Sequence, residues 1–406
     1  MSSNEITMND LEIDTTALSA KDRAELEKAQ PMWKMVLNQF LEHKLAVVGS
    51  VIITLFMLIS IFAGQIQSIT ELDPDAQNVA NRYLAPMTTA QAGQDVRETE
   101  VERFIVANPE VADKVQKALV EKGIVTVAEA DAIYELAARD IKEAVGALQS
   151  LGVAEATGLI SIFKNFETFH LFGTDELGRD VFIRLVYGTR VSMGVGVLVA
   201  IASALIGLLI GALAGFYGGM IDTILMRVTD ALLSLPTIPV LIVMAAIDLT
   251  KLPWLKAIVS TSNESIFKMV IILCLFSWMT VARLVRGSIL SIREREFVLA
   301  ARTLGAKDST IIVRHMFPNV IAPMLVSITL GVGESILFEA ALSFLGLGIM
   351  PPTPSWGNML NNAQELIYQA PFLAILPGVL ILLTTISFNY LGDGLQDAID
   401  PKAIRR

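Results

Sequence analysis

Cysteine, histidine and charge are all scarce in this sequence of 406 residues. Its one cysteine, Cys274, lies inside an apolar run and is interpreted as a packing residue. No internal disulfide and no CxxC metal or redox motif can form. The three histidines, His43, His170 and His315, are too few for a His-rich metal site, so no metal is expected. Charged residues make up 18% of the chain, against roughly 25% in typical globular proteins.

Apolar residues fill the place of the missing charge. They make up 53% of the chain, and the mean hydropathy is +0.58. Most of them lie in six charge-poor runs, each long enough or nearly so to cross a hydrocarbon core of about 30 Å at about 1.5 Å per residue. The sequence therefore predicts an all-α polytopic membrane protein with six transmembrane helices. The runs are residues 45–64, 191–217, 232–249, 266–282, 319–345 and 371–392.

The net charge of −10 is unevenly spread. Residues 71–170 carry 9 basic and 17 acidic side chains, whereas the chain beyond them is nearly neutral. An acidic chain argues against a nucleic-acid partner. Seven basic residues gather in 283–318, while residues 346–370 contain none. Because Lys and Arg are enriched in cytoplasmic loops, we expect 283–318, the tail 1–44 and the tail 396–406 in the cytoplasm.

The acidic segment then lies outside the cytoplasm, as a helical insertion over residues 65–170. Asn108 and Pro109 predict a helix start, and Gly123 its end. Thr126-x-x-Glu129 fits a capping box before one long helix over about 130–148. Two interpretations stay open: a lobe that shields its own apolar stripe, or a docking surface for an extracytoplasmic partner. Residues 171–395 form the transport domain with the other five spans.

Several residues within the spans stand out. Gly207, Gly211 and Gly215 recur every four residues, which favours close helix packing, with a hinge as the alternative. Glu334 and Glu339 are carboxylates in or near the fifth span, where burial is costly. They are expected to make interhelical contacts or to act in gating. Pro236 and Pro239 indicate a kink in the third span, and Trp356 an anchor at the outer membrane interface.

The basic connection between the fourth and fifth spans holds the main functional signal. A helix from about Glu294 to Leu304 places Phe297, Ala300, Ala301 and Leu304 on one side. The alanines keep that side shallow. Gly305 can end the helix with a positive φ, and a second short helix begins at Ala306 or Lys307. An apolar helix ringed by arginines suits docking into a soluble partner. A helix lying on lipid is the alternative.

This stretch resembles the coupling-helix signature of permease subunits of ATP-binding-cassette importers, which reads Glu-Ala-Ala, three residues, Gly, then nine residues before an apolar-x-Leu-Pro ending. Ala300, Ala301, Gly305 and Pro318 match it, and His315 with Asn319 fits the His-x-x-Pro-Asn ending of the peptide-importing branch. Leu299 departs from the signature, because it occupies the position of the glutamate. Glu296, one turn earlier, is a substitute carboxylate, and Ala306 follows the glycine.

Further blocks resemble the C-type subunit of the dipeptide, oligopeptide and nickel permeases over residues 170–401, but not over 71–165. They are residues 172–180, 184–190, 217–236, 342–348, 354–357 and 388–401. The resemblance implies a heterodimer with a B-type permease subunit in the cytoplasmic (inner) membrane, surrounded by lipid. It also implies two cytoplasmic ATPases and an extracytoplasmic peptide-binding protein. Residues 296, 300, 301, 305, 306, 315 and 318 would then couple the ATPases to the pore.

The residues themselves support a transport subunit rather than an enzyme. No GxxxxGK[ST] motif is present, so the chain is not expected to bind nucleotide phosphates. His170 and His315 are expected on opposite sides of the membrane, which excludes a Ser/His/Asp arrangement. No cofactor and no catalytic residue are expected. Import of peptides is the first hypothesis, and nickel or another small solute the second. A secondary transporter would need an inverted repeat, which the sequence does not display.

Overall fold

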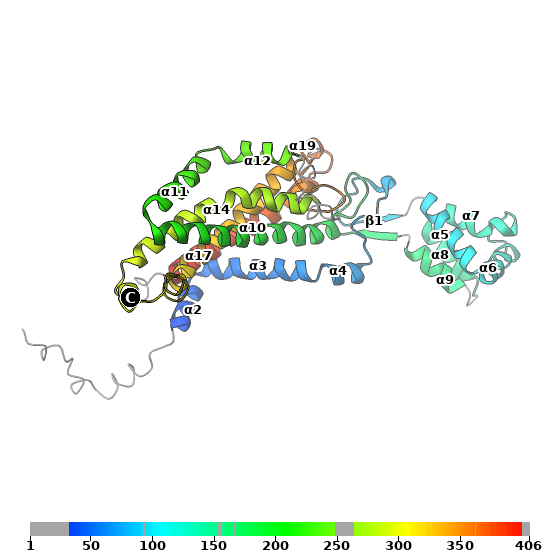
Figure 1. Ribbon diagram of the computed structural model, residues 1–406. Helices are drawn as coiled ribbons and strands as arrows, with labels where there is room; N and C mark the ends of the chain where they lie inside the picture. The colour runs from blue at the N-terminus through cyan, green and yellow to red at the C-terminus, as the bar shows by residue number, and fades with distance from the viewer. Residues whose placement is uncertain are drawn as a thin grey trace, which may run out of the picture.

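The computed structural model describes residues 32–91, 94–152, 156–165, 167–247, 264–361 and 363–399. Five long helices run side by side, and a separate helical lobe stands beyond one end of this bundle (Figure 1). The long helices are α3 (Lys44–Ile61), α10 (Val181–Tyr217), α14 (Glu264–Arg293), α17 (Phe317–Phe344) and α20 (Phe372–Ile399). Residues 1–31, Lys251, Lys256 and the basic residues of the C-terminal tail lie outside the described residues.

Shorter elements flank the bundle. At the end away from the lobe lie α2 (Met32–Glu42), α15 (Glu296–Thr303), α16 (Asp308–Thr310) and a π-helical turn, η5 (Ile311–Met316). At the end toward the lobe lie α4 (Ala63–Thr70), the turn η2 (Val79–Asn81), α18 (Trp356–Met359) and α19 (Ala363–Leu366).

Among the described residues, five helices are individually long and apolar enough to cross a membrane, α17 being counted there from Asp308. The third predicted span is different. It is a pair, α11 (Gly219–Leu233) and α12 (Thr237–Ala246), bent by 86°. Pro236 is the N-cap residue of α12 and has an extended backbone, so the chain turns there. The expected kink is therefore a complete break, and the count is six spans only if this pair is one of them.

The helices extend beyond the apolar runs that predict them. The second span begins ten residues earlier than expected, at Val181, because Asp180 caps it by accepting the N–H of Ile183 at 2.9 Å. Likewise, α14 continues past its apolar run to Arg293. Hydrophobicity alone marks the part of a helix within lipid, whereas caps mark where the helix ends.

The three glycines of α10 lie against α14. A Cβ atom added at Gly207 would lie 2.6 Å from the Cβ of Val281, and one at Gly211 would lie 2.5 Å from the carbonyl oxygen of Ala282. At Gly215 the nearest atoms belong to Ile289, at 2.8 Å. Cβ atoms do not approach other atoms this closely, so only glycine permits the observed packing of α10 on α14.

The lobe has a core of its own. Its helices are α5 (Gln94–Ala107), α6 (Pro109–Glu121), a 3₁₀ turn η3 (Glu129–Asp131), α7 (Ala132–Ala138), α8 (Ile141–Ser150) and α9 (Ala156–Asn165). Residues from all of these α-helices meet in one apolar cluster that includes Val101, Val115, Leu119, Ile133, Ile141, Leu148 and Leu159. Gly123 has a φ of +64° and ends α6 as predicted.

Two details of the lobe differ from the prediction. The capping box at Thr126 is absent, since the next helical turn begins at Glu129 with Ala128 as its N-cap. The single helix over 130–148 is broken, because Asp140 starts α8 by accepting the N–H of Lys142 at 2.9 Å. The Gln91 amide and then the Lys142 N–H hold the pKa of Asp140 below its usual value.

A two-stranded antiparallel hairpin, absent from the all-α prediction, connects the lobe to the bundle. β1 (Thr88–Gln91) pairs with β2 (Glu167–His170), with Gln91 opposite Glu167. Below the hairpin, Thr174 donates its N–H to the carbonyl of Leu84 at 3.2 Å, and Asn78 donates to Leu177 at 3.0 Å. Residues 65–91 therefore contact the segment before α10, and the separate core is confined to 94–165.

Because the hairpin joins two parts with separate cores, we expect that the lobe can be removed without unfolding the bundle. Replacing residues 92–166 with Asn-Gly joins Gln91 to Glu167 by a two-residue turn that matches their pairing. We expect this variant to enter membranes and to elute as a single species in detergent, because the lobe and the bundle have separate cores. A deletion of 78–177, which also removes the hairpin and the Thr174–Leu84 and Asn78–Leu177 contacts, is the control and should aggregate. Aggregation of the Asn-Gly variant would contradict the independence of the lobe.

Candidate functional site

The connection from α14 to α17 contains a short helix closed by a glycine. Gly305 follows α15 with a φ of +77°, the left-handed conformation expected for it. Ala306 donates its N–H to the carbonyl of Ala301 at 3.1 Å, and Gly305 donates to Arg302 at 3.0 Å. These two bonds are a Schellman motif, which satisfies the last carbonyls of the helix and turns the chain sharply.

The two faces of α15 differ from the prediction in one residue. Val298 and Ala301 are buried against the bundle, in a cluster with Val285, Ile289 and Met316. Ala301 therefore faces inward, and not outward with Ala300. The helix is shorter than expected and its inward face is set by this apolar cluster.

The outer face of α15 is the apolar surface of the connection. Phe297 is 45% exposed and Leu304 87% exposed, and Ala300 lies between them. Leu299, at the position of the signature glutamate, is exposed as well, and Glu296 lies on the same face in the first turn. We call the exposed residues 296, 297, 299, 300 and 304 the α15 outer face.

The remaining predicted residues of the connection lie in its second half. Ala306 and His315 are half-buried, and Pro318 is exposed in the first turn of α17. The Asn319 side chain donates to the backbone carbonyl of His315 at 2.8 Å. This contact links the π-helical turn to the start of α17.

The connection is attached to α10 through arginines. Arg293 donates to the carbonyls of Gly215 and Phe216 at 3.4 and 3.3 Å, where α10 ends. The Arg302 guanidinium lies 5.6 Å from the centre of the Phe216 ring, within the range of a cation–π contact. Movement of α15 would therefore act on the end of α10.

Two ion pairs tie the broken helix to α14. Arg286 binds Asp222 with both ends of its guanidinium, one contact being 2.6 Å between Nη2 and Oδ2. Arg283 binds Asp230, with 3.1 Å between Nε and Oδ1. In the sequence these arginines indicate only orientation, because spacing along the chain does not say which Asp meets which Arg.

Glu339 is fully buried and collects three hydroxyl groups. It accepts hydrogen bonds from Ser192 on α10 (3.1 Å), Ser343 on α17 (2.7 Å) and Ser355 at the start of α18 (2.9 Å). We call these four residues the Glu339 cage. A buried carboxylate needs such donors, so the cage connects two spans with the loop after α17.

Trp356 contacts the Glu339 cage, and the prediction that it anchors the chain at the membrane interface is wrong. It is fully buried rather than anchored at the membrane interface. Its backbone N–H donates to Ser192 at 3.1 Å, and its ring meets that of Phe56 edge to face at 5.9 Å. Gly188 allows this approach, since a Cβ there would lie 3.1 Å from the Trp356 ring. The motif Pro354-Ser-Trp-Gly357 was visible in the sequence, but its buried partners were not.

Glu334 has a different environment from Glu339. It is exposed on the surface of α17, at the edge of a small cavity that the α11–α12 break also lines. Ser277 and Thr280 of α14 contribute hydroxyls there, among Leu235, Leu273 and other apolar residues. Its carboxylate thus lies on the surface of the bundle, beside the α11–α12 break.

His170 and His315 are far from each other, as expected. His170 ends β2 and His315 lies in the π-helical turn, at opposite ends of the bundle (Figure 1). His170 forms a buried pair with Asp180, with 2.6 Å between Nδ1 and Oδ2. Within the described ranges, no three His, Cys, Asp or Glu residues come together to hold a metal ion.

Loss of the Glu339 carboxylate is expected to destabilise the bundle. Glu339→Ala leaves three buried hydroxyls without their acceptor, at a cost of about 1–3 kcal/mol each. Glu339→Gln keeps the shape and one acceptor oxygen and should cost less. Glu334→Ala, on the same helix, is the matched control. Thermal unfolding of the detergent-solubilised protein should rank Glu339→Ala as the least stable, then Glu339→Gln, then the control. A Glu339→Ala protein as stable as the control would contradict the role of the cage.

Comparisons with known proteins match these features to one family. The family model for the binding-protein-dependent transport system inner membrane component matches residues 207–405, and that for the N-terminal TM domain of oligopeptide transport permease C matches 31–86. The first covers the α10–α14 packing, the connection and the Glu339 cage apart from Ser192.

Relatives of known name extend the similarity. The dipeptide transport system permease protein DppC of Alkalihalophilus pseudofirmus is 41% identical over 233 residues, 57% of this chain and 72% of that protein. The glutathione transport system permease protein GsiD of Escherichia coli O157:H7 is 42% identical over the same shares. A solved structure of the MetNI methionine ABC transporter, in an inward-facing conformation, covers 55% of this chain and 98% of its own at 20% identity, with a TM-score of 0.41. With two family models and relatives above 40% identity, this chain belongs to the ATP-binding-cassette importer permeases of the peptide and oligopeptide family.

Proposed function

We propose that this chain is one transmembrane permease subunit of an importer that moves short peptides across the cytoplasmic membrane at the expense of ATP. The α15 outer face is the observation that carries the coupling part of this proposal. It presents apolar side chains at the bundle end away from the lobe, and membership of the family supplies a partner for such a surface. The relatives named for dipeptides and glutathione support peptides as the substrate.

In this proposal the end that carries α15 is cytoplasmic and the lobe is extracytoplasmic. Arg295, Arg302 and Arg314 are all exposed at the α15 end, as the enrichment of basic residues in cytoplasmic loops predicts. Both termini then lie in the cytoplasm. ATP hydrolysis belongs to two separate ATPase subunits, one of which docks on the α15 outer face through Glu296, Ala300 and the connection from Gly305 to Pro318.

Two further partners complete the assembly. A B-type permease subunit covers the surface where Glu334 and the α11–α12 break are exposed, and the two subunits form the pore between them. A peptide-binding protein delivers the substrate at the lobe end. Glu339 then has an interhelical role through its cage. Glu334 has a gating role, because its carboxylate on α17 lies beside the break between α11 and α12.

The direct test is transport by the reconstituted complex. Proteoliposomes with both permease subunits, the ATPases and the binding protein should accumulate radiolabelled Ala-Ala only with ATP, and liposomes without the ATPases should not. Uptake driven by a proton gradient without ATP would refute the proposal. Nickel ions, supplied in a parallel set, test the second hypothesis, which ATP-driven nickel uptake without peptide uptake would favour.

The coupling role predicts a specific effect at Gly305. Its position is open, with no atom within 4 Å of an added Cβ, so a substitution acts through the backbone alone. Gly305→Val places a β-branched residue at a φ of +77°, which costs roughly 1–2 kcal/mol. Uptake and substrate-stimulated ATP hydrolysis should fall several-fold, while the complex still assembles. Gly305→Asn is the matched control, since asparagine tolerates this conformation, and it should retain most activity. Normal transport by Gly305→Val would show that this turn does not couple the ATPase to the pore.

A further inference from the structure

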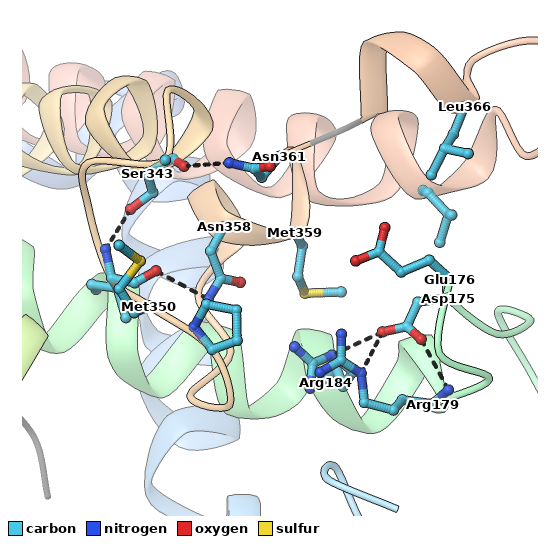
Figure 2. Close-up of a pocket in the computed structure, with 14 residues that line it drawn as sticks. Asp175, Glu176, Arg179, Arg184, Ser343, Met350, Asn358, Met359, Asn361 and Leu366 are labelled. Carbon is cyan, nitrogen blue, oxygen red and sulfur yellow. Dashed lines mark hydrogen bonds and ion pairs between the residues drawn. The ribbon is translucent and has the colours of Figure 1, made fainter. Parts of the chain in front are cut away.

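A cavity of about 170 Å³ lies at the lobe end of the bundle, apart from the connection and from the α11–α12 break. One wall is the segment before α10 with the first turn of that helix, and the other is the loop from α17 to α20 (Figure 2). Drug-sized pockets have volumes of about 300–1,000 Å³. This cavity therefore suits a much smaller ligand.

Two buried arginines form the charged wall. Arg184 is 2% exposed and Arg179 6% exposed. Arg179 binds Asp175 at 2.7 Å, whereas Arg184 Nε lies 3.5 Å from the same carboxylate and makes no hydrogen bond with any described residue. A different nitrogen of Arg184, Nη1, donates to the backbone carbonyl of Pro74 at 3.0 Å. Asp175 is thus shared by two guanidinium groups, and Asp75 lies 3.9 Å from Arg184 Nη1. Both arginines line the cavity, where a ligand carboxylate can bind them.

An acidic side chain and several flexible apolar side chains also line the cavity. Glu176 lines the cavity next to Asp175, and in Figure 2 the side chains of Glu176 and Met359 point toward each other. Met350, Met359 and Leu366 are among the apolar lining residues. Flexible methionines accept side chains of different shapes. With two arginines and two acids, the lining is neutral overall and suits a ligand that carries one charge of each sign.

Three of the long helices of the bundle contribute residues to the cavity. Arg184 belongs to α10, Leu373 to α20 and Ser343 to α17, where Ser343 is also a member of the Glu339 cage. Its loop wall is held in place by Asn358, whose side chain donates to Thr353 at 2.6 Å, and by Asn361, which donates to Ser343 at 3.4 Å. A ligand in the cavity would contact three spans at once.

We propose that this cavity is an entry site for short zwitterionic peptides on the extracytoplasmic side, with Arg179 and Arg184 binding the carboxylate and Glu176 binding the ammonium group. The assignment rests on the proposed function, because it takes the substrate class and the side of arrival from it. It adds a binding site within this subunit, separate from the pore surface around Glu334 and from the binding protein.

The test combines residue changes with changes to the peptide termini. Uptake of Ala-Ala, N-acetyl-Ala-Ala and Ala-Ala amide is measured at sub-saturating concentration with wild-type, Glu176→Gln and Arg179→Lys complexes. Glu176→Gln should lower Ala-Ala uptake about tenfold or more but leave N-acetyl-Ala-Ala uptake almost unchanged, because a bond between charged groups is lost only once. Arg179→Lys keeps the charge but loses the planar fork, and it should show the same coupling with the amide. The binding protein is identical in every arm, so its own preference cancels in these ratios.

Two exposed residues at the same end serve as controls, Glu365→Gln and Arg82→Lys, neither of which lines the cavity. They should behave as wild type with all three peptides. Equal effects of Glu176→Gln on free and acetylated peptide, or of Arg179→Lys on free and amidated peptide, would overturn the entry site and identify a structural ion-pair cluster instead. If wild-type complexes fail to take up Ala-Ala with ATP, the proposed function itself fails, which is a different outcome.

Discussion

The carboxylate of Glu339 is the polar group around which the lobe end of the bundle is organised. It is fully buried, and a buried charge or acid without partners is costly. Three serines from two spans and from the loop after α17 supply those partners. Because the three serines come from different elements and all bind one carboxylate, the cage holds α10, α17 and the loop to α20 together. The buried Trp356 and the walls of the cavity follow from that arrangement.

One helix, α10, links both ends of the bundle (Figure 1). α10 contacts the connection through the carbonyls of Gly215 and Phe216, packs on α14 through its glycines, and reaches the cage through Ser192. At its other end Arg184 lines the cavity. A helix of 37 residues is about 55 Å long, so a shift at either end is transmitted along a rigid element rather than through loops. The Asp222–Arg286 and Asp230–Arg283 pairs attach the broken helix to α14, and thus to the same unit.

The features that depend on local chemistry could be predicted from the sequence. Apolar runs located the five continuous spans, and Gly305 and Gly123 end their helices with positive φ because the chain there needs a residue without a Cβ. Features that depend on contacts between distant residues could not be predicted. The inward direction of Ala301 depends on Val285 and Ile289, and the burial of Trp356 on Phe56 and Gly188. The early start of α10 lies between these cases, since Asp180 is an ordinary N-cap signal that Arg184 and Arg190 obscured in a search for uncharged runs.

Arg184 is a charged residue in the first turn of α10, and its burial within protein explains how the fold tolerates it there. An arginine at the end of a long helix is tolerated where protein rather than lipid surrounds it, and here Asp175, Pro74 and Asp75 lie within 4 Å. Arg179 and Arg184 share Asp175, Asp75 lies 3.9 Å from Arg184 Nη1, and a third acid, Glu176, lines the cavity together with both arginines. Charges of both signs thus line one cavity, and a zwitterionic ligand complements them.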